Sequence, residues 1–235
     1  MKLFDLFTRK EKSEDKSKKI EMTTDYKTQL DIVEKKVFSK MKPLGFKKNG
    51  RTFNRRLDDG IIQVINFQSG QYPLTDNYEI PELRENLYGK FVVNMGVCVE
   101  NLFKFQFPTE NKKFYKEYEC QIRARLGTLL TGQDYWWKIT DDNTKITEEI
   151  IEGLETIGFD WFAGVDTKEK IITNLGNLPY DRSPRVKLDI ALIVWFDNKE
   201  KGEKLITEYY NNISSSSKAH KDYVKDLAKE IGIEL

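Results

Sequence analysis

Hydrophobic and polar positions alternate around a tight turn in the first half of the chain, a pattern that predicts antiparallel strands. Two alternating segments, over about 52–57 and 61–68, flank residues 58–60, where an Asp-Gly pair is typical of a β-hairpin turn. Similar hydrophobic runs predict a third strand over 91–99 and a fourth over 120–130. We therefore predict an antiparallel sheet of about four or more strands.

Hydrophobic residues follow helical spacing on both sides of this sheet. After a predicted cap at Thr24 or Asp25, they recur every three or four positions from Tyr26 to Leu44, the stripe of an amphipathic helix, and Gly45 follows as a stop signal. After Ile139 the spacing becomes helical again, and the segment 188–196 is apolar on most sides, which predicts a central buried helix. Helix starts in this half are predicted near Thr147 (with a stop at Gly158), Asp166, Ser183, Asn198 and the serine run 214–217. The predicted fold class is α+β, with an N-terminal helix and a C-terminal group of helices packed on one side of the sheet.

Charge density separates the amino terminus from the rest of the chain. Residues 1–23 are dominated by charged and serine side chains that bury too little apolar surface to order, so we predict a flexible tether. Its apolar tip, residues 3–7, is either a frayed terminus or a docking peptide for a partner or a membrane surface. Residues 24–235 are predicted to form one α+β domain, sheet-rich over 24–139 and helical over 140–235.

The charge balance argues against a protein dedicated to binding phosphate backbones. The chain carries 39 Lys and Arg against 38 Asp and Glu, and its pI of about 7.6 is below the values above about 9 that are usual for such domains. No apolar stretch approaches the roughly 20 residues that cross a bilayer, and no secretory signal pattern is present. We therefore expect a cytoplasmic protein without stable membrane insertion. We expect Cys98 and Cys120 to point to opposite faces of the sheet and to remain reduced.

Residue types that carry catalysis are scarce. One histidine, His220, and two cysteines supply too few ligands for a structural zinc site and no evident nucleophile–base pair. The glycine-rich motifs that hold nucleotides are absent. Glu119 lies in a segment similar to the acidic strand of metal-dependent nucleases, but no matched acid and lysine accompany it. We predict no catalytic residue, no metal site and no cofactor, and the sequence leans against an enzyme.

One group of polar residues interrupts strongly apolar strands and is the first candidate for a binding surface. Its members are Asn66, Gln68, Asn94, Arg123 and Arg125. If the strands are neighbours, these side chains cluster on the face away from the helices, where arginine suits a protein partner with complementary acids. The long connection over 70–89 is another candidate, because a loop of this length is either functional or mobile.

A second group is basic and interleaved with the aromatic residues Phe46 and Phe53. Its members are Lys47, Lys48, Arg51, Arg55 and Arg56. Basic residues beside strand aromatics are typical of a platform that stacks bases and neutralises phosphates. The same residues at solvent-facing positions also keep a sheet soluble and block edge pairing. The alternative function is therefore nucleic-acid binding or processing by this basic strand face.

A set of segments together resembles a known family: 45–48 with Phe53, 63–68, 91–96, 120–127 and the tryptophan pair 136–137. The family is the domain of unknown function 4304 family, which is widespread and mostly bacterial. The resemblance covers most of the chain after Thr24, late helices included, and implies one domain without known catalytic residues. It also implies that an immunity or antitoxin-like role beside a secreted toxin is one version of partner binding. We therefore expect a non-catalytic protein-binding module.

Overall fold

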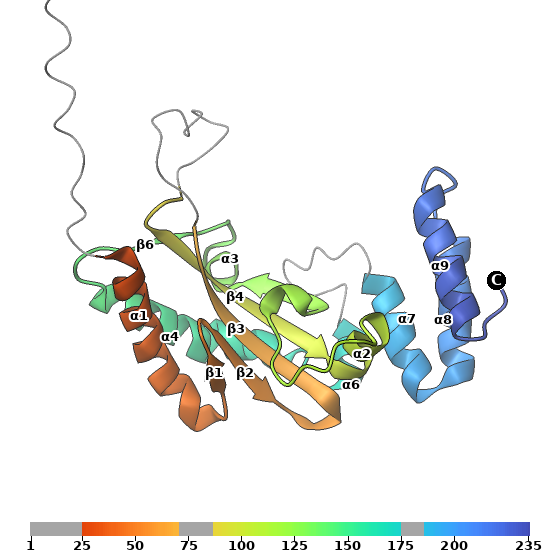
Figure 1. Cartoon of the computed structure of the whole chain (residues 1–235), viewed down its shortest axis with the longest axis horizontal. Coiled ribbons are helices and arrows are strands. Elements are labelled where there is room, and N and C mark those ends of the chain that lie inside the picture. The colour runs from red at the N-terminus through yellow and green to blue at the C-terminus, as the bar shows by residue number, and fades with distance from the viewer. Residues whose placement is uncertain (1–24, 71–86, 175–185) are drawn as a thin grey trace, which may run out of the picture.

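The computed structural model describes three stretches of the chain, residues 25–70, 87–174 and 186–235. Together they build an antiparallel sheet with helices packed against one face (Figure 1). The α+β class predicted from the sequence is confirmed. The tether predicted over 1–23 and the helix start predicted at Ser183 lie outside the described residues, as does most of the 70–89 connection.

Six strands form the sheet in these stretches: β1 (Lys47–Asn49), β2 (Thr52–Arg56), β3 (Ile61–Ser69), β4 (Lys90–Val99), β5 (Ile122–Arg125) and β6 (Trp137–Lys138). They pair antiparallel in the order β1-β2-β3-β4-β5, and β6 pairs with the start of β4. The predicted hairpin turn is confirmed, since Asp59 and Gly60 have φ angles of 55° and 71°, the left-handed conformation that such turns require.

Two parts of the sheet differ from the prediction. The short edge strand β1 was not predicted, because three exposed polar residues carry no hydrophobic alternation. The segment 120–130 is β5 followed by a helix, α3 (Leu126–Thr131), and not one strand. A continuous apolar run does not distinguish a strand from a helix. Gly127, in the first turn of α3, permits close packing of this helix, because a Cβ there would lie 2.7 Å from the backbone oxygen of Tyr135.

The helix predicted before the sheet is present as α1 (Tyr26–Met41). Asp25 caps it by accepting a hydrogen bond of 3.1 Å from the backbone N–H of Lys27. The predicted hydrophobic stripe is buried at Tyr26, Leu30, Val33, Val37 and Met41, but its last member, Leu44, lies beyond the helix and is 43% exposed. A single turn, Lys42–Leu44, then ends at Gly45, whose φ of 91° breaks the helix as expected.

The later helices follow in the order α2 (Glu100–Gln106), α3, α4 (Thr144–Gly153), α5 (Phe159–Ala163), α6 (Lys168–Asn174), α7 (Val186–Asp197), α8 (Lys199–Asn211) and α9 (Lys218–Glu230). The prediction that a helix stops at Gly158 is wrong, because a π-helical turn, Leu154–Gly158, joins α4 to α5. Gly158 serves close packing there, since a Cβ on it would lie 3.4 Å from Cε of Met95 in the sheet.

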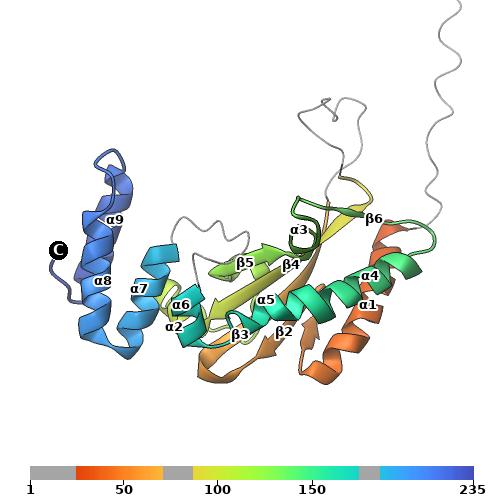
Figure 2. The same cartoon turned by 180° about the vertical axis from the view of Figure 1, so that it is seen from behind.

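Most of the hydrophobic core lies on the face of the sheet that α1, α4 and α5 cover (Figure 2). Four aromatic rings cross this face from β2 to β6, namely Phe53, Phe67, Phe91 and Trp137, with successive centroids 5.7, 6.2 and 5.9 Å apart. These separations are typical of favourable aromatic pairs. The helices α7, α8 and α9 extend past the end of the sheet, where α7 contacts α2 and α6 (Figure 1).

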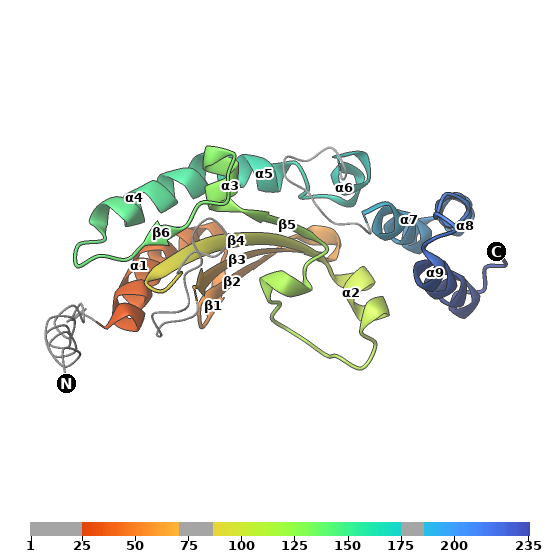
Figure 3. The same cartoon turned by 90° about the horizontal axis from the view of Figure 1, so that it is seen from above.

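The opposite face of the sheet, which we call the outer face, is covered only in part. The segment 107–121, between α2 and β5, folds over one end of it (Figure 3). A small hydrophobic cluster lies beneath this segment and comprises Ile62, Val64, Cys98, Phe103, Tyr115 and Cys120. The prediction that the two cysteines point to opposite faces is wrong, because Cys120 precedes β5 and belongs to the covering segment. Both thiols meet in this cluster, and both are free.

Candidate functional site

The strand register places the first predicted group of polar residues on the outer face. Asn66 pairs with Asn94 across β3 and β4, and Asn94 pairs with Arg125 across β4 and β5. Gln68 and Arg123 each lie two residues from these pairs along their own strands, so their side chains point to the same side. The structure therefore brings this group together.

The asparagine and glutamine side chains form a hydrogen-bonded row on this face. The Asn94 Nδ2 donates to Gln68 Oε1 at 2.8 Å, and it lies 3.5 Å from Asn66 Oδ1. The Asn66 Nδ2 in turn donates to the hydroxyl of Thr52 at 3.0 Å and to the backbone oxygen of Arg51 at 3.3 Å. Because Asn94 is only 3% exposed, these bonds fix the orientation of a buried amide.

The covering segment 107–121 is bound to the sheet by its own polar contacts. Asn54 donates to the backbone oxygen of Tyr115 at 2.9 Å and accepts from the backbone N–H of Tyr115 at 2.7 Å. The Tyr115 hydroxyl donates to Glu100 Oε1 at 3.0 Å, and Arg56 donates to the other Glu100 oxygen at 2.8 Å. The Arg56 guanidinium lowers the pKa of Glu100, while burial raises the pKa of Tyr115. The segment is thus a fixed wall on the outer face.

Both predicted arginines hold carboxylates of the same chain. Arg123 forms an ion pair with Glu117 of the covering segment, and Arg125 forms one with Asp134, which follows α3. The Arg125 guanidinium also lies over the ring of Trp136, 5.4 Å from its centroid. Each arginine is therefore charge-compensated and held in place before any ligand arrives.

Two adjoining hollows lie between these side chains, with volumes of about 400 and 730 Å³. They share Gln68, Glu117, Arg123 and Arg125, so they form one depression. Tyr118, which is 70% exposed, lines the larger hollow. We call this depression the outer-face groove, and the residues that matter below are Asn66, Asn94, Gln68, Glu117, Tyr118, Arg123, Arg125, Asp134 and Trp136.

Sequence reasoning missed four residues of the groove, namely Glu117, Tyr118, Asp134 and Trp136. One signal was available for Trp136, because neighbouring residues in a strand point to opposite faces and the next residue, Trp137, is buried in the core. The other three lie in segments without regular periodicity. Their contribution depends on how the covering segment and the turn after α3 fold back onto the sheet.

The structure divides the second, basic group between several environments. Three members form separate ion pairs: Lys48 with Glu34 at 2.8 Å, Arg51 with Asp31 at 2.9 Å and Arg56 with Glu100 at 2.8 Å. Arg55 lies over the rings of Phe46 and Phe159, 4.9 and 5.1 Å from their centroids, and burial lowers its pKa. Lys47 is exposed on the edge strand β1. The register places Arg55 opposite the buried Gln63 and Arg56 opposite Ile62, so the group does not share one face.

Other sites in the described chain offer little chemistry. Within residues 25–70, 87–174 and 186–235, no group of three or more His, Cys, Asp and Glu side chains is placed to hold a metal ion. His220 is bound elsewhere, because its Nε2 lies 2.7 Å from the hydroxyl of Tyr209 between α8 and α9. Among the described helices, none has the length and apolar character needed to span a membrane.

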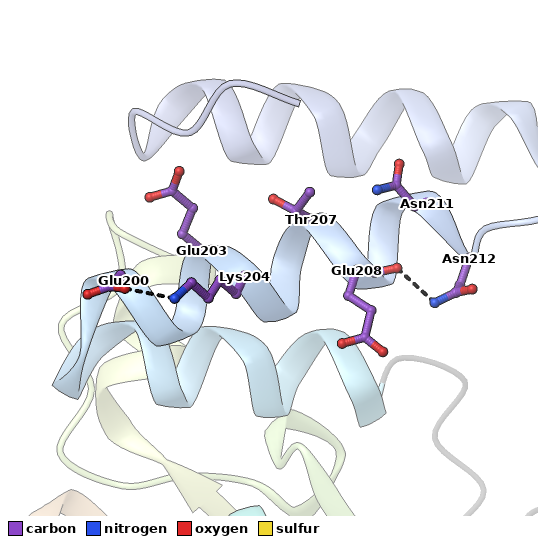
Figure 4. A pocket seen from close by; sticks show the side chains of 7 residues that line it. All are labelled: Glu200, Glu203, Lys204, Thr207, Glu208, Asn211 and Asn212. Carbon is purple, nitrogen blue, oxygen red and sulfur yellow. Dashed lines mark hydrogen bonds and ion pairs between the residues drawn. The ribbon is translucent and has the colours of Figure 1, made fainter.

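A further hollow of about 540 Å³ lies along α8 (Figure 4). The described residues that line it all come from this helix and its C-cap, Asn212. Glu200 already holds Lys204 at 2.7 Å, and the side chains project from a single helix instead of converging from several elements. This surface is a solvated helix face, so the outer-face groove is the stronger candidate.

Comparison with known proteins identifies a family. No curated protein matches the chain, and no solved structure matches it. The family model described as Domain of unknown function (DUF4304) matches residues 37–164. This stretch contains the six strands and the whole outer-face groove, and it ends before α6, although we expected the resemblance to include the late helices. Because the match covers more than half of the chain, the protein belongs to the DUF4304 family.

Proposed function

We propose that this protein is a non-catalytic binding module that holds a protein partner in the outer-face groove. The observation that supports this proposal is the convergence of Arg123, Arg125, Tyr118 and Trp136 around a polar floor. Arginine, tyrosine and tryptophan are the residue types that most often dominate the binding energy of protein interfaces. A cytoplasmic location and a bacterial source fit this proposal.

The rigidity of the groove also favours binding. Its floor is hydrogen-bonded, its arginines are ion-paired, and one wall is attached to the sheet through Asn54. A surface whose side chains are already ordered loses less conformational entropy when a partner docks. The groove is therefore suited to a partner that fits an existing shape.

One version of this function is an immunity or antitoxin-like role, in which the groove binds a toxin made by the same cell. In this version the partner is encoded beside the gene for this protein. Co-purification of that gene product with the wild-type chain supports the version, whereas a partner encoded elsewhere removes it and leaves the binding role in place.

The alternative, nucleic-acid binding, has support from one observation, the position of the Arg125 guanidinium over the ring of Trp136, 5.4 Å from its centroid, in the same groove as the exposed Tyr118. The basic group that suggested it is divided over two faces and largely ion-paired. Affinity for oligonucleotides that falls steeply with salt is the expected signature. If single- and double-stranded oligonucleotides do not bind at about 50 mM salt, this alternative is removed.

A capture experiment with the full-length chain tests the proposal. The double variant Arg123→Glu/Arg125→Glu is compared with Lys225→Glu/Lys229→Glu, which makes the same charge change at two exposed positions of α9. We expect the groove variant to bind the partner at least about tenfold more weakly and the α9 variant to bind normally. Equal binding by both variants contradicts the proposal.

A second variant separates binding from folding. Tyr118 is 70% exposed, so Tyr118→Ala is expected to change the melting temperature little. If the groove is the binding surface, this variant weakens partner capture while the protein stays folded. Full capture by a folded Tyr118→Ala together with a folded Arg123→Glu/Arg125→Glu places the partner on another surface.

A further inference from the structure

The floor of the outer-face groove presents one hydrogen-bond donor and one acceptor that are not used. Within the row of amides, Asn94 Nδ2 donates to Gln68 Oε1 at 2.8 Å, so these two atoms already have a partner. Within the described part of the chain, Gln68 Nε2 and Asn94 Oδ1 have no hydrogen-bond partner. Both side chains line the smaller hollow, and Asn94 is only 3% exposed. Neither atom is fully buried, so solvent reaches both from the groove, and a ligand that enters the groove can replace this water with its own hydrogen bonds.

The charges around this floor are balanced. Arg123 is paired with Glu117 and Arg125 with Asp134, and Arg51, which lines the larger hollow, is paired with Asp31 of α1, so each of these three cations already has a carboxylate partner. An anionic ligand would approach both carboxylates and compete with them for the arginines. An uncharged polar ligand meets no such repulsion. The complementary acids that we expected on the partner are already present in the chain itself.

The hydrogen-bonding pattern and the charge balance point to one class of ligand. We propose that the groove recognises an uncharged amide of its partner, either a peptide group or the side chain of an asparagine or glutamine. The amide N–H of the partner donates to Asn94 Oδ1, and its carbonyl oxygen accepts from Gln68 Nε2. Trp136 and Tyr118 border the same depression, where aromatic faces cover the flat amide plane. This inference rests on the proposed function and specifies the chemistry of its site.

Gln68→Glu is a suitable test variant because it keeps the internal bond and replaces the free donor with an acceptor that carries a negative charge. One carboxylate oxygen of the glutamate still accepts from Asn94 Nδ2, while the other replaces the amide nitrogen. Gln68 is exposed to solvent at the groove, so the change leaves the core intact. Asn211→Asp on α8 makes the same amide-to-acid change far from the groove and serves as the matched control.

The probes are three small molecules added to the ¹⁵N-labelled full-length chain and followed by NMR. Acetamide carries a single uncharged amide, acetate is the acid of the same shape without an amide, and glucose is an uncharged polyol. A compound of this size binds with a Kd of about 1–10 mM at best, so each is titrated to about 50 mM. We expect the amide probe to shift the side-chain amide signals of Gln68 and Asn94. We expect its Kd from this titration to be at least about tenfold lower than the Kd of the acid or of glucose.

We expect the Gln68→Glu variant not to bind the amide probe, and the Asn211→Asp control to bind it as the wild type does. The inference is overturned if the acid or glucose probe binds as tightly as the amide, if none of the three shifts these signals, or if Gln68→Glu binds the amide normally. These outcomes leave the groove as a partner surface of different chemistry. Failure of the proposed function is distinct, because it appears as unchanged partner capture by the groove variants described above.

Discussion

Replacing Asn54 with alanine tests whether the segment 107–121 is held on the outer face as the structure indicates. Asn54 is 8% exposed and makes two hydrogen bonds to the backbone of Tyr115. Loss of the bond to the Tyr115 oxygen costs about 1 kcal/mol net, and leaving the buried N–H of Tyr115 without its acceptor costs about 1–3 kcal/mol. We therefore expect Asn54→Ala to lower the free energy of unfolding by about 2–4 kcal/mol.

Urea unfolding followed by tryptophan fluorescence measures this loss, and hydrogen exchange locates it. For a chain of this length, about 2–4 kcal/mol corresponds to a fall in melting temperature of about 5–15 °C. The Tyr115 amide is expected to lose its protection against exchange before the amides of β3 and β4 do. The matched control is Asn211→Ala on α8, where an exposed asparagine is replaced and the expected change stays within about 0.5 kcal/mol.

The reasoning fails if Asn54→Ala unfolds within about 0.5 kcal/mol of the wild type and keeps a protected Tyr115 amide. That result means that the contacts of Phe103 and Tyr115 hold the segment without help from Asn54. A large loss of stability with a protected Tyr115 amide also contradicts the argument, because the loss would then arise elsewhere in the sheet.

Three further predictions concern the same sheet. Gly96→Ala is expected to destabilise the fold by about 1–3 kcal/mol, because its Cβ would lie 2.7 Å from Sγ and 2.9 Å from Cβ of Cys120. In urea unfolding, Gly96→Ala/Cys120→Ala is expected to recover only part of this loss, because the Cβ contact remains. Burial raises the pKa of the Cys120 thiol, so as the pH rises this thiol ionises in the unfolded chain before it does in the folded one. The free energy of unfolding is therefore expected to fall as the pH rises above 9.0, the ordinary thiol value, and Cys120→Ala is expected to weaken that dependence. Lys48→Met removes the ion-pair partner of Glu34, a carboxyl whose pKa is raised by burial. We expect this variant to lose about 1–2 kcal/mol of unfolding free energy at pH 7, and less in acid, where Glu34 takes up a proton. A difference from the wild type that is the same at pH 4 as at pH 7 contradicts this assignment.

The face of each strand residue could be predicted from the sequence wherever alternation was regular. Asn66, Gln68 and Asn94 stand at polar positions inside apolar strands, and the parity of the strands alone places them on one side. The hairpin turn and α1 followed from equally local signals, an Asp-Gly pair and a capped hydrophobic stripe. These features depend on neighbours in the sequence.

The remainder of the groove depends on contacts between distant segments, which no local pattern encodes. Glu117 and Tyr118 reach the groove because distant residues hold the segment on the sheet, among them Asn54, some sixty positions earlier, which binds the Tyr115 backbone, and Arg123, which pairs with Glu117. The same long-range folding brings Cys120 to Cys98 and overturns the prediction that they lie on opposite faces. The basic group failed as a single surface for a related reason, since Glu34 and Asp31 on α1 take up two of its cations.

The ion pairs within the groove have a consequence for how the protein meets other molecules. Among the described residues of the groove, Arg123 and Arg125 are compensated by Glu117 and Asp134, so these side chains create no strong field of either sign to draw in polyanions. Encounters with a partner are then unsteered, at association rates of about 10⁵–10⁶ M⁻¹s⁻¹ that depend little on ionic strength. The protein must then distinguish its partner from other macromolecules by the lifetime of the complex, so its selectivity depends on the dissociation rate.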